Sequence, residues 1–169
     1  MHLIIDGYNL LHVGRSPVQI SSEDLQLQRD RLIEGLALYR QMRPCNITLV
    51  FDGWQGGWAT ERKERKGGMD ILFSRLGETA DEVIRRLVKE KGSGVVVVTS
   101  DREISRYAEK LSVAVIPSDR FRERMTGTSP SGEKDAGDSE EEGRGMKKKG
   151  PSRRPSKREK RLHIALKKL

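Results

Sequence analysis

The stretch GVVVVTSD, at residues 94–101, decides the fold of this chain. Its four consecutive valines show no alternation of apolar and polar residues, so a strand formed by them would be buried on both faces. Strands of this kind are typical of parallel sheets that are covered by helices on both sides. The strand also runs directly into an acid, Asp101. The stretch therefore predicts a parallel α/β sheet with a carboxylate at its carboxyl edge.

Four other short apolar runs have the same character. They are HLIID (2–6), ITLVFD (47–52), MDILFS (69–74) and VAVIPSD (113–119). Amphipathic helical patterns separate them, at residues 21–43, 80–91 and 101–111, with a last short one around Phe121 and Met125. This order predicts a three-layer α/β domain with a mainly parallel central sheet over residues 1–125.

The charge of the chain is concentrated at its end. Residues 126–143 hold one Lys and six acids among Gly, Ser and Pro, which predicts a disordered acidic linker. Residues 144–169 hold 12 Lys and Arg and one Glu, so this basic tail is expected to bind a polyanion. A short helix is predicted at 157–169, with Leu162, Ala165, Leu166 and Leu169 on one side. The candidate RNA contacts in the tail are Lys147, Lys148, Lys149, Arg153 and Arg154.

Cysteine and hydropathy restrict the location of the chain. Its single cysteine, Cys45, allows no internal disulfide and suits the reducing cytoplasm. The first apolar run is three residues long and meets Asp6, so neither a signal peptide nor a membrane span is expected there. No apolar run elsewhere approaches the length of a membrane span, so no membrane partner is expected. The three histidines are isolated from one another and receive no catalytic role.

Acids follow nearly every predicted strand. Asp6, Asp52 and Asp101 end three of them, and Asp81 stands at the start of the helix that follows residues 69–74. Ligands of open α/β sheets bind outside the carboxyl ends of the strands. We therefore expect these four side chains to lie along one edge of the domain.

Such a cluster would carry uncompensated charge, since no Lys or Arg occurs within DGYN (6–9), FDG (51–53) or ETAD (78–81). Two carboxylates about 4 Å apart repel by roughly 4 kcal/mol at an effective dielectric near 20. Retained protons or a bound cation would relieve that repulsion. Oxygen ligands without His or Cys favour Mg²⁺ or Mn²⁺, and a carboxylate-held Mg²⁺ suits phosphoryl chemistry.

Helix capping is the competing interpretation of the same acids. Thr79 to Glu82 and Ser100 to Glu103 both fit the capping box, in which case Asp81 and Asp101 would be ordinary first-turn acids. Asp119, in a layout that copies TSDRE, is assigned to capping alone.

The ordered motifs DGYN (6–9), FDG (51–53), GETADEVI (77–84) and VVTSDRE (97–103) resemble those of the NYN domain, a branch of the PIN-like nucleases. The match covers about residues 1–125 and is most similar to the YacP-like bacterial subgroup, which includes a ribosome-associated endoribonuclease that cleaves mRNA. The resemblance implies a PIN-like fold and a metal-dependent nuclease activity.

The resemblance also implies roles for individual residues. Asp6, Asp81 and Asp101 would be the metal ligands, with Asp52 as a neighbouring acid near a second shell or second metal. Asn9 would hold Asp6 or a substrate oxygen. Ser100 and Thr99 would line the site. Weaker candidates are Glu78, Glu82 and Glu103.

The stretch after FDG departs from the family pattern. It contains Trp54 and Trp58 around a Gly-Gly pair, followed by the basic residues Arg62, Lys63, Arg65 and Lys66. Aromatic faces with interleaved cations suit single-stranded RNA, so we interpret this stretch as a loop that overhangs the acids. A solvated loop whose tryptophans pack on the body is the alternative. Tyr8 could likewise stack on a base or pack.

The leading hypothesis is an Mg²⁺- or Mn²⁺-dependent endoribonuclease that acts on RNA, with the ribosome and mRNA as partners. The first alternative is a non-catalytic RNA- or ribosome-binding factor in which the acids serve as caps. The second is a metal-dependent nuclease that acts on DNA flaps. No GxxxxGK[ST] motif supports an ATPase, and the oligomeric state is left open.

Overall fold

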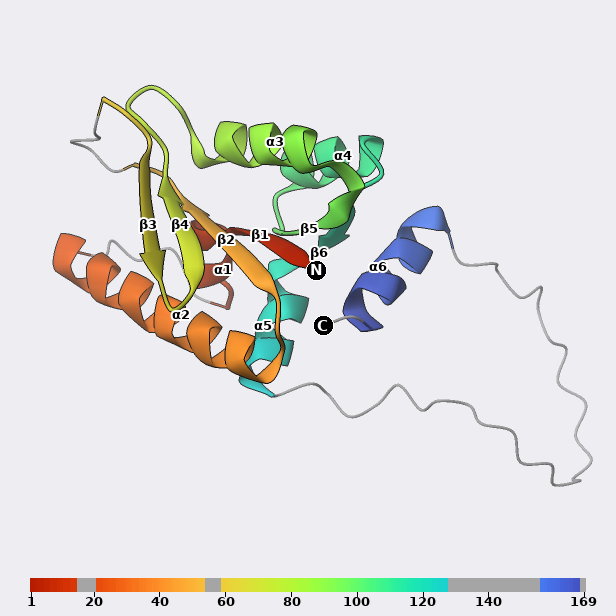
Figure 1. Cartoon of the computed structure of the whole chain (residues 1–169), viewed down its shortest axis with the longest axis horizontal. Helices are drawn as coiled ribbons and strands as arrows, with labels where there is room; N and C mark the ends of the chain where they lie inside the picture. The colour runs from red at the N-terminus through yellow and green to blue at the C-terminus, as the bar shows by residue number, and fades with distance from the viewer. Residues whose placement is uncertain (15–20, 54–58, 128–155, 168–169) are drawn as a thin grey trace, which may run out of the picture.

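The computed structural model describes residues 1–14, 21–53, 59–127 and 156–167. Six strands form one sheet in the order β3-β4-β2-β1-β5-β6 (Figure 1). They are β1 (His2–Asp6), β2 (Asn46–Phe51), β3 (Arg62–Lys66), β4 (Met69–Phe73), β5 (Val95–Val98) and β6 (Ala114–Ile116). All neighbours are parallel except β3, which is antiparallel to β4. The predicted mainly parallel sheet is confirmed.

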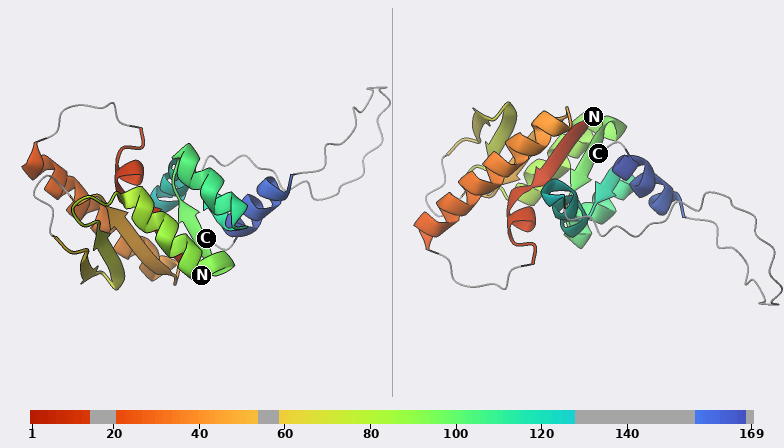
Figure 2. Two further views of the ribbon diagram at one scale, coloured as in Figure 1. Left: turned by 90° about the horizontal axis from the view of Figure 1, so that it is seen from above. Right: turned by 90° about the horizontal axis from the view of Figure 1, so that it is seen from below.

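Helices cover both faces of the sheet. They are α1 (Gly7–Leu11), α2 (Ser22–Met42), α3 (Ala80–Lys91), α4 (Arg102–Lys110), α5 (Ser118–Thr126) and α6 (Lys157–Lys167), with a 3₁₀ turn, η1 (Gly92–Gly94). Helices α3 and α4 lie over one face of the sheet, and α1, α2 and α5 pack on the other (Figure 2). The predicted three-layer arrangement is confirmed.

The apolar strands are explained by these two layers. Along β1, Leu3 and Ile5 point into the core under α2 and α5, whereas Ile4 points into the core under α3 and α4. All three side chains are fully buried, as are those of Val97 and Val98 in β5. Because both faces of these strands are covered, the sequence shows continuous apolar runs without alternation.

The basic stretch RKERK forms a strand, β3, so the prediction of an overhanging loop is wrong at residues 62–66. Its register pairs Arg62 with Phe73 and Lys66 with Met69, so the strand runs along the sheet edge, away from the carboxyl ends of the parallel strands. Gly67 and Gly68 join it to β4 with φ values of 55° and 74°. A two-residue turn with both φ values positive is the usual connection of a β-hairpin.

Helix α6, at the end of the basic tail, packs beside β6 (Figure 1). Its residues Leu162, Ala165 and Leu166 join the core cluster that also includes α2 and α5, and Ala165 is 2% exposed. Arg124 of α5 donates a hydrogen bond to the carbonyl oxygen of Leu166 at 2.8 Å. The predicted apolar side of this helix is confirmed for these three residues.

Several predicted features lie outside the described residues. They are Trp54, Trp58, Leu169, most of the acidic linker, and the tail residues Lys147, Lys148, Lys149, Arg153 and Arg154. Among the helices that the structure does describe, none combines the length and the apolar character that crossing a membrane requires.

The strand order creates a switch point beside the first strand. The chain leaves β1 to form β2 on one side of it, and later returns to form β5 on the other side. Crevices at the carboxyl ends of strands whose connections diverge in this way are the usual ligand sites of open α/β sheets.

Candidate active site

An open cavity of about 570 Å³ lies at this switch point. Four aspartates line it: Asp6, Asp81, Asp101 and Asp119. Tyr8, Asn9, His12 and Ser100 also contribute to its walls. We call this space the acid cavity. The expectation that acids from separate strand ends meet at one edge therefore holds for Asp6, Asp81 and Asp101.

Asp6 is the most buried acid of the cavity, with 8% of the residue exposed. It forms the N-cap of α1, where its Oδ1 accepts a hydrogen bond from the backbone N–H of Asn9 at 3.1 Å. Its Oδ2 accepts one from the Thr99 hydroxyl, also at 3.1 Å. Burial nevertheless raises the pKa of Asp6 to about 6, and the charges of Asp81 and Asp101 add to that rise against the two hydrogen bonds.

Close packing brings the Asp6 turn against the neighbouring strand. A Cβ atom on Gly7 would collide with the Phe51 ring and with the carbonyl oxygen of Val50. Gly53 is similarly pressed against the backbone of Ser74. The glycines of DGYN and FDG are thus required by close approach to the chain beside them.

Asp81 differs from Asp6 and Asp101 in how its carboxylate is held. Within the described residues it makes no hydrogen bond and no ion pair. Partial burial raises its pKa, the charge of Asp101 raises it further, and Arg85, one turn along α3, opposes the rise. Arg85 therefore partly compensates the charge of Asp81. The motifs alone did not indicate it, because Arg85 lies outside ETAD.

Helix capping fixes the direction of Asp81. Thr79 and Glu82 form the predicted capping box, with the Glu82 N–H donating to the Thr79 hydroxyl at 3.3 Å and the Thr79 N–H donating to Glu82 Oε2 at 2.9 Å. Because these two residues satisfy the end of α3, Asp81 is not needed as a cap and faces the cavity.

Asp101 is itself the N-cap of α4. Its Oδ1 accepts hydrogen bonds from the backbone N–H groups of Glu103 at 2.7 Å and Ile104 at 2.9 Å. The predicted capping box from Ser100 to Glu103 is therefore wrong, because the N-cap residue is Asp101 and not Ser100. The cap uses one carboxylate oxygen and leaves the side chain in the wall of the acid cavity.

Asn9 ties together three parts of the cavity wall. Its backbone N–H holds Asp6, while its side-chain Oδ1 accepts hydrogen bonds from the Ser100 N–H at 2.9 Å and from the Ser118 hydroxyl at 2.8 Å. The Ser100 hydroxyl in turn accepts from the Ser118 N–H at 3.0 Å. Sequence reasoning missed Ser118, which is fully buried.

Asp119, predicted to serve capping alone, does lie in the first turn of α5, but it also lines the acid cavity. The N-cap of α5 is Pro117, which makes no side-chain capping bond, and Asp119 lies in the first helical turn with its side chain in the cavity wall. The sequence contained the signal, because PSD after β6 repeats the TSD layout that places Asp101 after β5.

Asp52 lies beside the acid cavity and does not line it. It is exposed at the end of β2, and its Oδ1 accepts a hydrogen bond from the Ala80 N–H at 2.5 Å, in the first turn of α3. Its charge still contributes to the raised pKa of Asp81. The three glutamates named as weaker candidates lie elsewhere: Glu82 caps α3, Glu103 pairs with Arg85, and Glu78 pairs with Arg75 and Arg86.

The predicted substrate contacts divide between the cavity and the far sheet edge. The Tyr8 ring lines the cavity but also packs edge-on against Phe51, with a centroid distance of 5.1 Å. On β3, Lys63 pairs with Asp70 at 3.2 Å and Lys66 pairs with Asp30 at 3.0 Å. Arg62 pairs within its own strand, and Arg65 is exposed. These four basic residues do not line the acid cavity.

The acids suit a hard divalent cation in kind and in charge, because they supply carboxylate oxygens. Burial raises the pKa values of Asp6 and Asp81, and repulsion from neighbouring carboxylates adds to the rise. Within the described ranges, however, no three His, Cys, Asp or Glu side chains are close enough to hold one ion together. Direct ligation by one or two carboxylates, with water completing the shell, is the mode that this spacing allows.

A three-layer α/β domain with an acidic cavity at the carboxyl edge of its sheet is the architecture of the PIN-like proteins. Two solved structures of Rae1 (YacP) from Bacillus subtilis, one of them a mutant, share this fold. The mutant superposes with a TM-score of 0.62 at 20% identity over 75% of each chain. The other superposes with a TM-score of 0.59 at 22% identity, over 75% of this chain and 74% of Rae1.

Sequence comparison gives the family. A model of the YacP-like NYN domain matches residues 3–163, so the chain belongs to the YacP-like NYN domain family. The protein YacP of Bacillus subtilis (strain 168) is 28% identical over 102 residues, and the match spans 59% of each chain. The resemblance inferred from the four motifs is confirmed. Membership in this family supports a nuclease-type, RNA-related function.

Proposed function

We propose that this protein is an Mg²⁺- or Mn²⁺-dependent endoribonuclease that hydrolyses RNA phosphodiester bonds, with mRNA at the ribosome as its substrate. One observation carries the proposal: carboxylates from two strand ends and one helix start line a single cavity, and the pKa values of two of them are raised. Perturbed carboxyl groups in a cleft are a common sign of an active site.

The acids of the cavity differ in the contacts that hold them. Asp6 and Asp101 are fixed by hydrogen bonds to backbone and hydroxyl groups, so they provide carboxylates of set position. Asp81, free of such bonds among the described residues, is better able than Asp6 or Asp101 to reorient toward a ligand. Asn9 acts as a positioning residue, because it links Asp6 to the turn that bears Asp101.

A divalent ion would be held by Asp81 together with Asp6 or Asp101, and it would keep several waters, as Mg²⁺ does in proteins. When bound, such an ion supplies a water of lowered pKa and offsets charge on the phosphate. The aspartates of the cavity would position the ion, and the Thr99 hydroxyl keeps the Asp6 carboxylate oriented.

RNA and ribosome binding rest on charge and on the family. The basic tail carries 12 Lys and Arg against one Glu, which favours a polyanion through counterion release. RNA of the ribosome is the polyanion we propose, because the YacP-like subgroup includes a ribosome-associated endoribonuclease.

A non-catalytic RNA-binding protein is the second candidate, and specific contacts favour it. Asp101 caps α4 and Asp52 bonds the first turn of α3, so both acids have structural work. A DNA-directed nuclease would use the same cavity, and it is separated from the leading proposal by its substrate alone.

The substitution Asp81→Asn tests these candidates. We expect it to abolish Mn²⁺-dependent cleavage of single-stranded RNA, while RNA affinity and the free energy of unfolding change little. The matched control is Asp24→Asn, which alters a first-turn acid of α2 outside the cavity. Cleavage that survives in Asp81→Asn, or that is absent from the unaltered protein with Mg²⁺ and Mn²⁺, would refute the nuclease proposal. Faster cleavage of matched DNA would favour the DNA alternative.

A further inference from the structure

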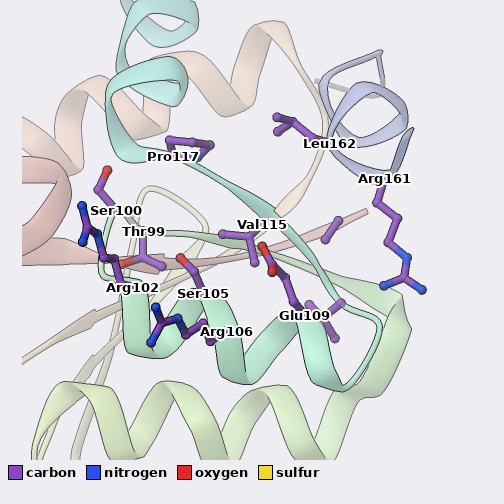
Figure 3. Close-up of a pocket in the computed structure, with 12 residues that line it drawn as sticks. Thr99, Ser100, Arg102, Ser105, Arg106, Glu109, Val115, Pro117, Arg161 and Leu162 are labelled. Atoms are coloured by element: carbon purple, nitrogen blue, oxygen red, sulfur yellow. The ribbon is translucent and has the colours of Figure 1, made fainter. Parts of the chain in front are cut away.

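A second cavity, of about 480 Å³, opens between α4, β6 and α6 (Figure 3). Its walls carry three arginines: Arg102 and Arg106 from α4, and Arg161 from α6. Ser100 and Ser105 add hydroxyl groups, and Glu109 is the only acid in its lining as far as the structure is described. We call this space the arginine cavity. The predictions from sequence assigned no function to Arg102 or Arg106, and they included Arg161 only as part of the polyanion-binding tail.

The arginine cavity carries a surplus of positive charge. Within the described residues, Arg102 and Arg106 make no hydrogen bond and no ion pair, and both side chains are exposed. Arg161 donates a hydrogen bond to the Ser112 hydroxyl at 3.1 Å, which leaves its other N–H groups for a ligand. Guanidinium groups present parallel donors that match the oxygens of a phosphate.

The two cavities share a wall. Ser100 lines both of them, and the chain from Ser100 to Arg102 places Asp101 in the acid cavity and the next side chain in the arginine cavity. Two hydrogen bonds fix this turn in place: the Ser100 N–H donates to Asn9, and the Ser118 N–H donates to the Ser100 hydroxyl. A polymer lying across the turn would therefore meet carboxylates on one side and guanidinium groups on the other.

The C-terminal helix completes the arginine cavity. Leu162 and Arg161 of α6 form its outer wall, and the helix is held by packing of Ala165 and by the bond from Arg124. Without α6, the cavity would lose one of its three arginines and the wall that faces β6.

We propose that the arginine cavity is a phosphate subsite that binds a backbone phosphate of the RNA strand next to the one in the acid cavity. The proposal rests on the proposed function for the identity of the polymer. It gives α6 a direct part in substrate binding, distinct from general attraction by the tail.

The test measures RNA affinity without turnover. Fluorescence anisotropy of a labelled eight-nucleotide single-stranded RNA is followed in EDTA for the full chain, for Arg102→Gln/Arg106→Gln and for Arg161→Gln. The control is Arg31→Gln, which removes one charge, as Arg161→Gln does, from an exposed position on α2. We expect about a tenfold or greater loss of affinity in the double variant, about threefold in Arg161→Gln and less than twofold in the control.

Salt dependence provides a second readout. Loss of the subsite for one phosphate should reduce the slope of log K against log salt by about 0.7, the value per neutralised phosphate of a single strand. Equal affinities and slopes for the double variant and Arg31→Gln would overturn the subsite. Because Arg102 and Arg106 are exposed and unpaired among the described residues, the double variant tests the proposal even if Arg161→Gln loosens α6.

Competition separates the sources of phosphate. Inorganic phosphate and AMP are added to the unaltered protein and to the double variant. We expect both to compete only weakly against the oligonucleotide. Binding of either as tight as that of RNA, and lost in the double variant, would replace the RNA subsite with a site for a small phosphate compound. Since no step requires cleavage, an inactive Asp81→Asn protein that retains arginine-dependent binding would still support the subsite.

Discussion

The acid cavity and the β3 edge are both rich in charge, but they treat it in opposite ways. On β3, Lys63 and Lys66 have carboxylate partners at 3.2 Å and 3.0 Å, and the strand lies at the solvent-facing edge of the sheet. In the acid cavity, Asp6 is buried and feels the charges of Asp81 and Asp101, while Arg85 partly compensates the charge of Asp81. Charge is thus paired along β3 and concentrated in the acid cavity.

The pKa values express this difference. Burial raises the pKa of Asp6 to about 6, whereas hydrogen bonds from Gln26 and Lys66 lower the pKa of Asp30 beside β3. Ionised Asp6 therefore destabilises the fold, and ionised Asp30 stabilises it. Perturbed buried charges cluster at functional sites, whereas charged side chains along an edge strand protect it from pairing with other chains.

The largest expected effect is that of Asp6→Asn, which acts on activity and stability in opposite directions. Cleavage should fall by about a thousandfold or more, the scale on which single catalytic groups act. At pH 7 the free energy of unfolding should rise by about 1–2 kcal/mol, because a buried charge is removed at the cost of one altered hydrogen bond. Single-turnover cleavage and urea denaturation measure the two effects.

Asp30→Asn is the matched control at the β3 edge. It should leave cleavage unchanged and lower stability slightly, because it breaks the contact with Lys66. If the two variants changed activity to the same degree, the contrast between the regions would have no functional meaning.

The second prediction is a pH dependence with a definite sign. The folded pKa of Asp6, about 6, lies above its unfolded value of 3.8, so the native state holds a proton that the unfolded chain releases first. Stability from this group therefore falls as the pH rises from about 4 to about 7, by roughly 3 kcal/mol for a shift of this size. When both proteins are denatured in EDTA across this range, the free energy of unfolding of Asp6→Asn should increase relative to that of the unaltered chain as the pH rises. A constant difference would contradict the raised pKa.

Much of the fold could be predicted because its core strands are unambiguous. Runs such as VVVV and LII have one physical interpretation, since apolar side chains on both faces of a strand require cover on both faces. Strand β3 could not be found by hydrophobicity, because RKERK contains no apolar residue. Its evidence lay in the Gly67-Gly68 turn, in the nearby partner Asp70 of β4, and in Asp30 of α2, which is 36 residues from its partner Lys66.

The acids of the site were predictable for a related reason: parallel strands bring their carboxyl ends to one edge. What could not be predicted was which acid is held and which is free. Asp52 accepts a bond from Ala80, a donor 28 residues away that depends on the tertiary arrangement, whereas Asp101 caps its own helix through local donors. Asp119 enters the cavity although it resembles a cap. Short local patterns do not distinguish a cap from a cavity wall, because both place an acid at the first turn of a helix.

The third prediction concerns the cation that the acid cavity favours. Mn²⁺ at about 100 times its dissociation constant should stabilise the protein by about 2.7 kcal/mol at pH 7, if it binds the native state alone. Calorimetry with and without Mn²⁺ measures the rise in Tm, and Asp81→Asn should lose most of it. An equal rise in both proteins would place the ion away from Asp81.

The smallest expected effect separates ion pairing from charge on β3 itself. Lys66→Gln removes a charge and the contact with Asp30, whereas Arg65→Gln removes a charge from an exposed side chain without an ion pair in the described part of the chain. Because exposed pairs contribute about 0–1 kcal/mol, Lys66→Gln should be less stable than Arg65→Gln by under 1 kcal/mol, and salt should shrink the gap. Urea denaturation at low and high salt measures it, and cleavage should be equal in the two variants. A large loss of cleavage in both variants would mean that β3 contacts the RNA, since the two variants have only the loss of a positive charge in common.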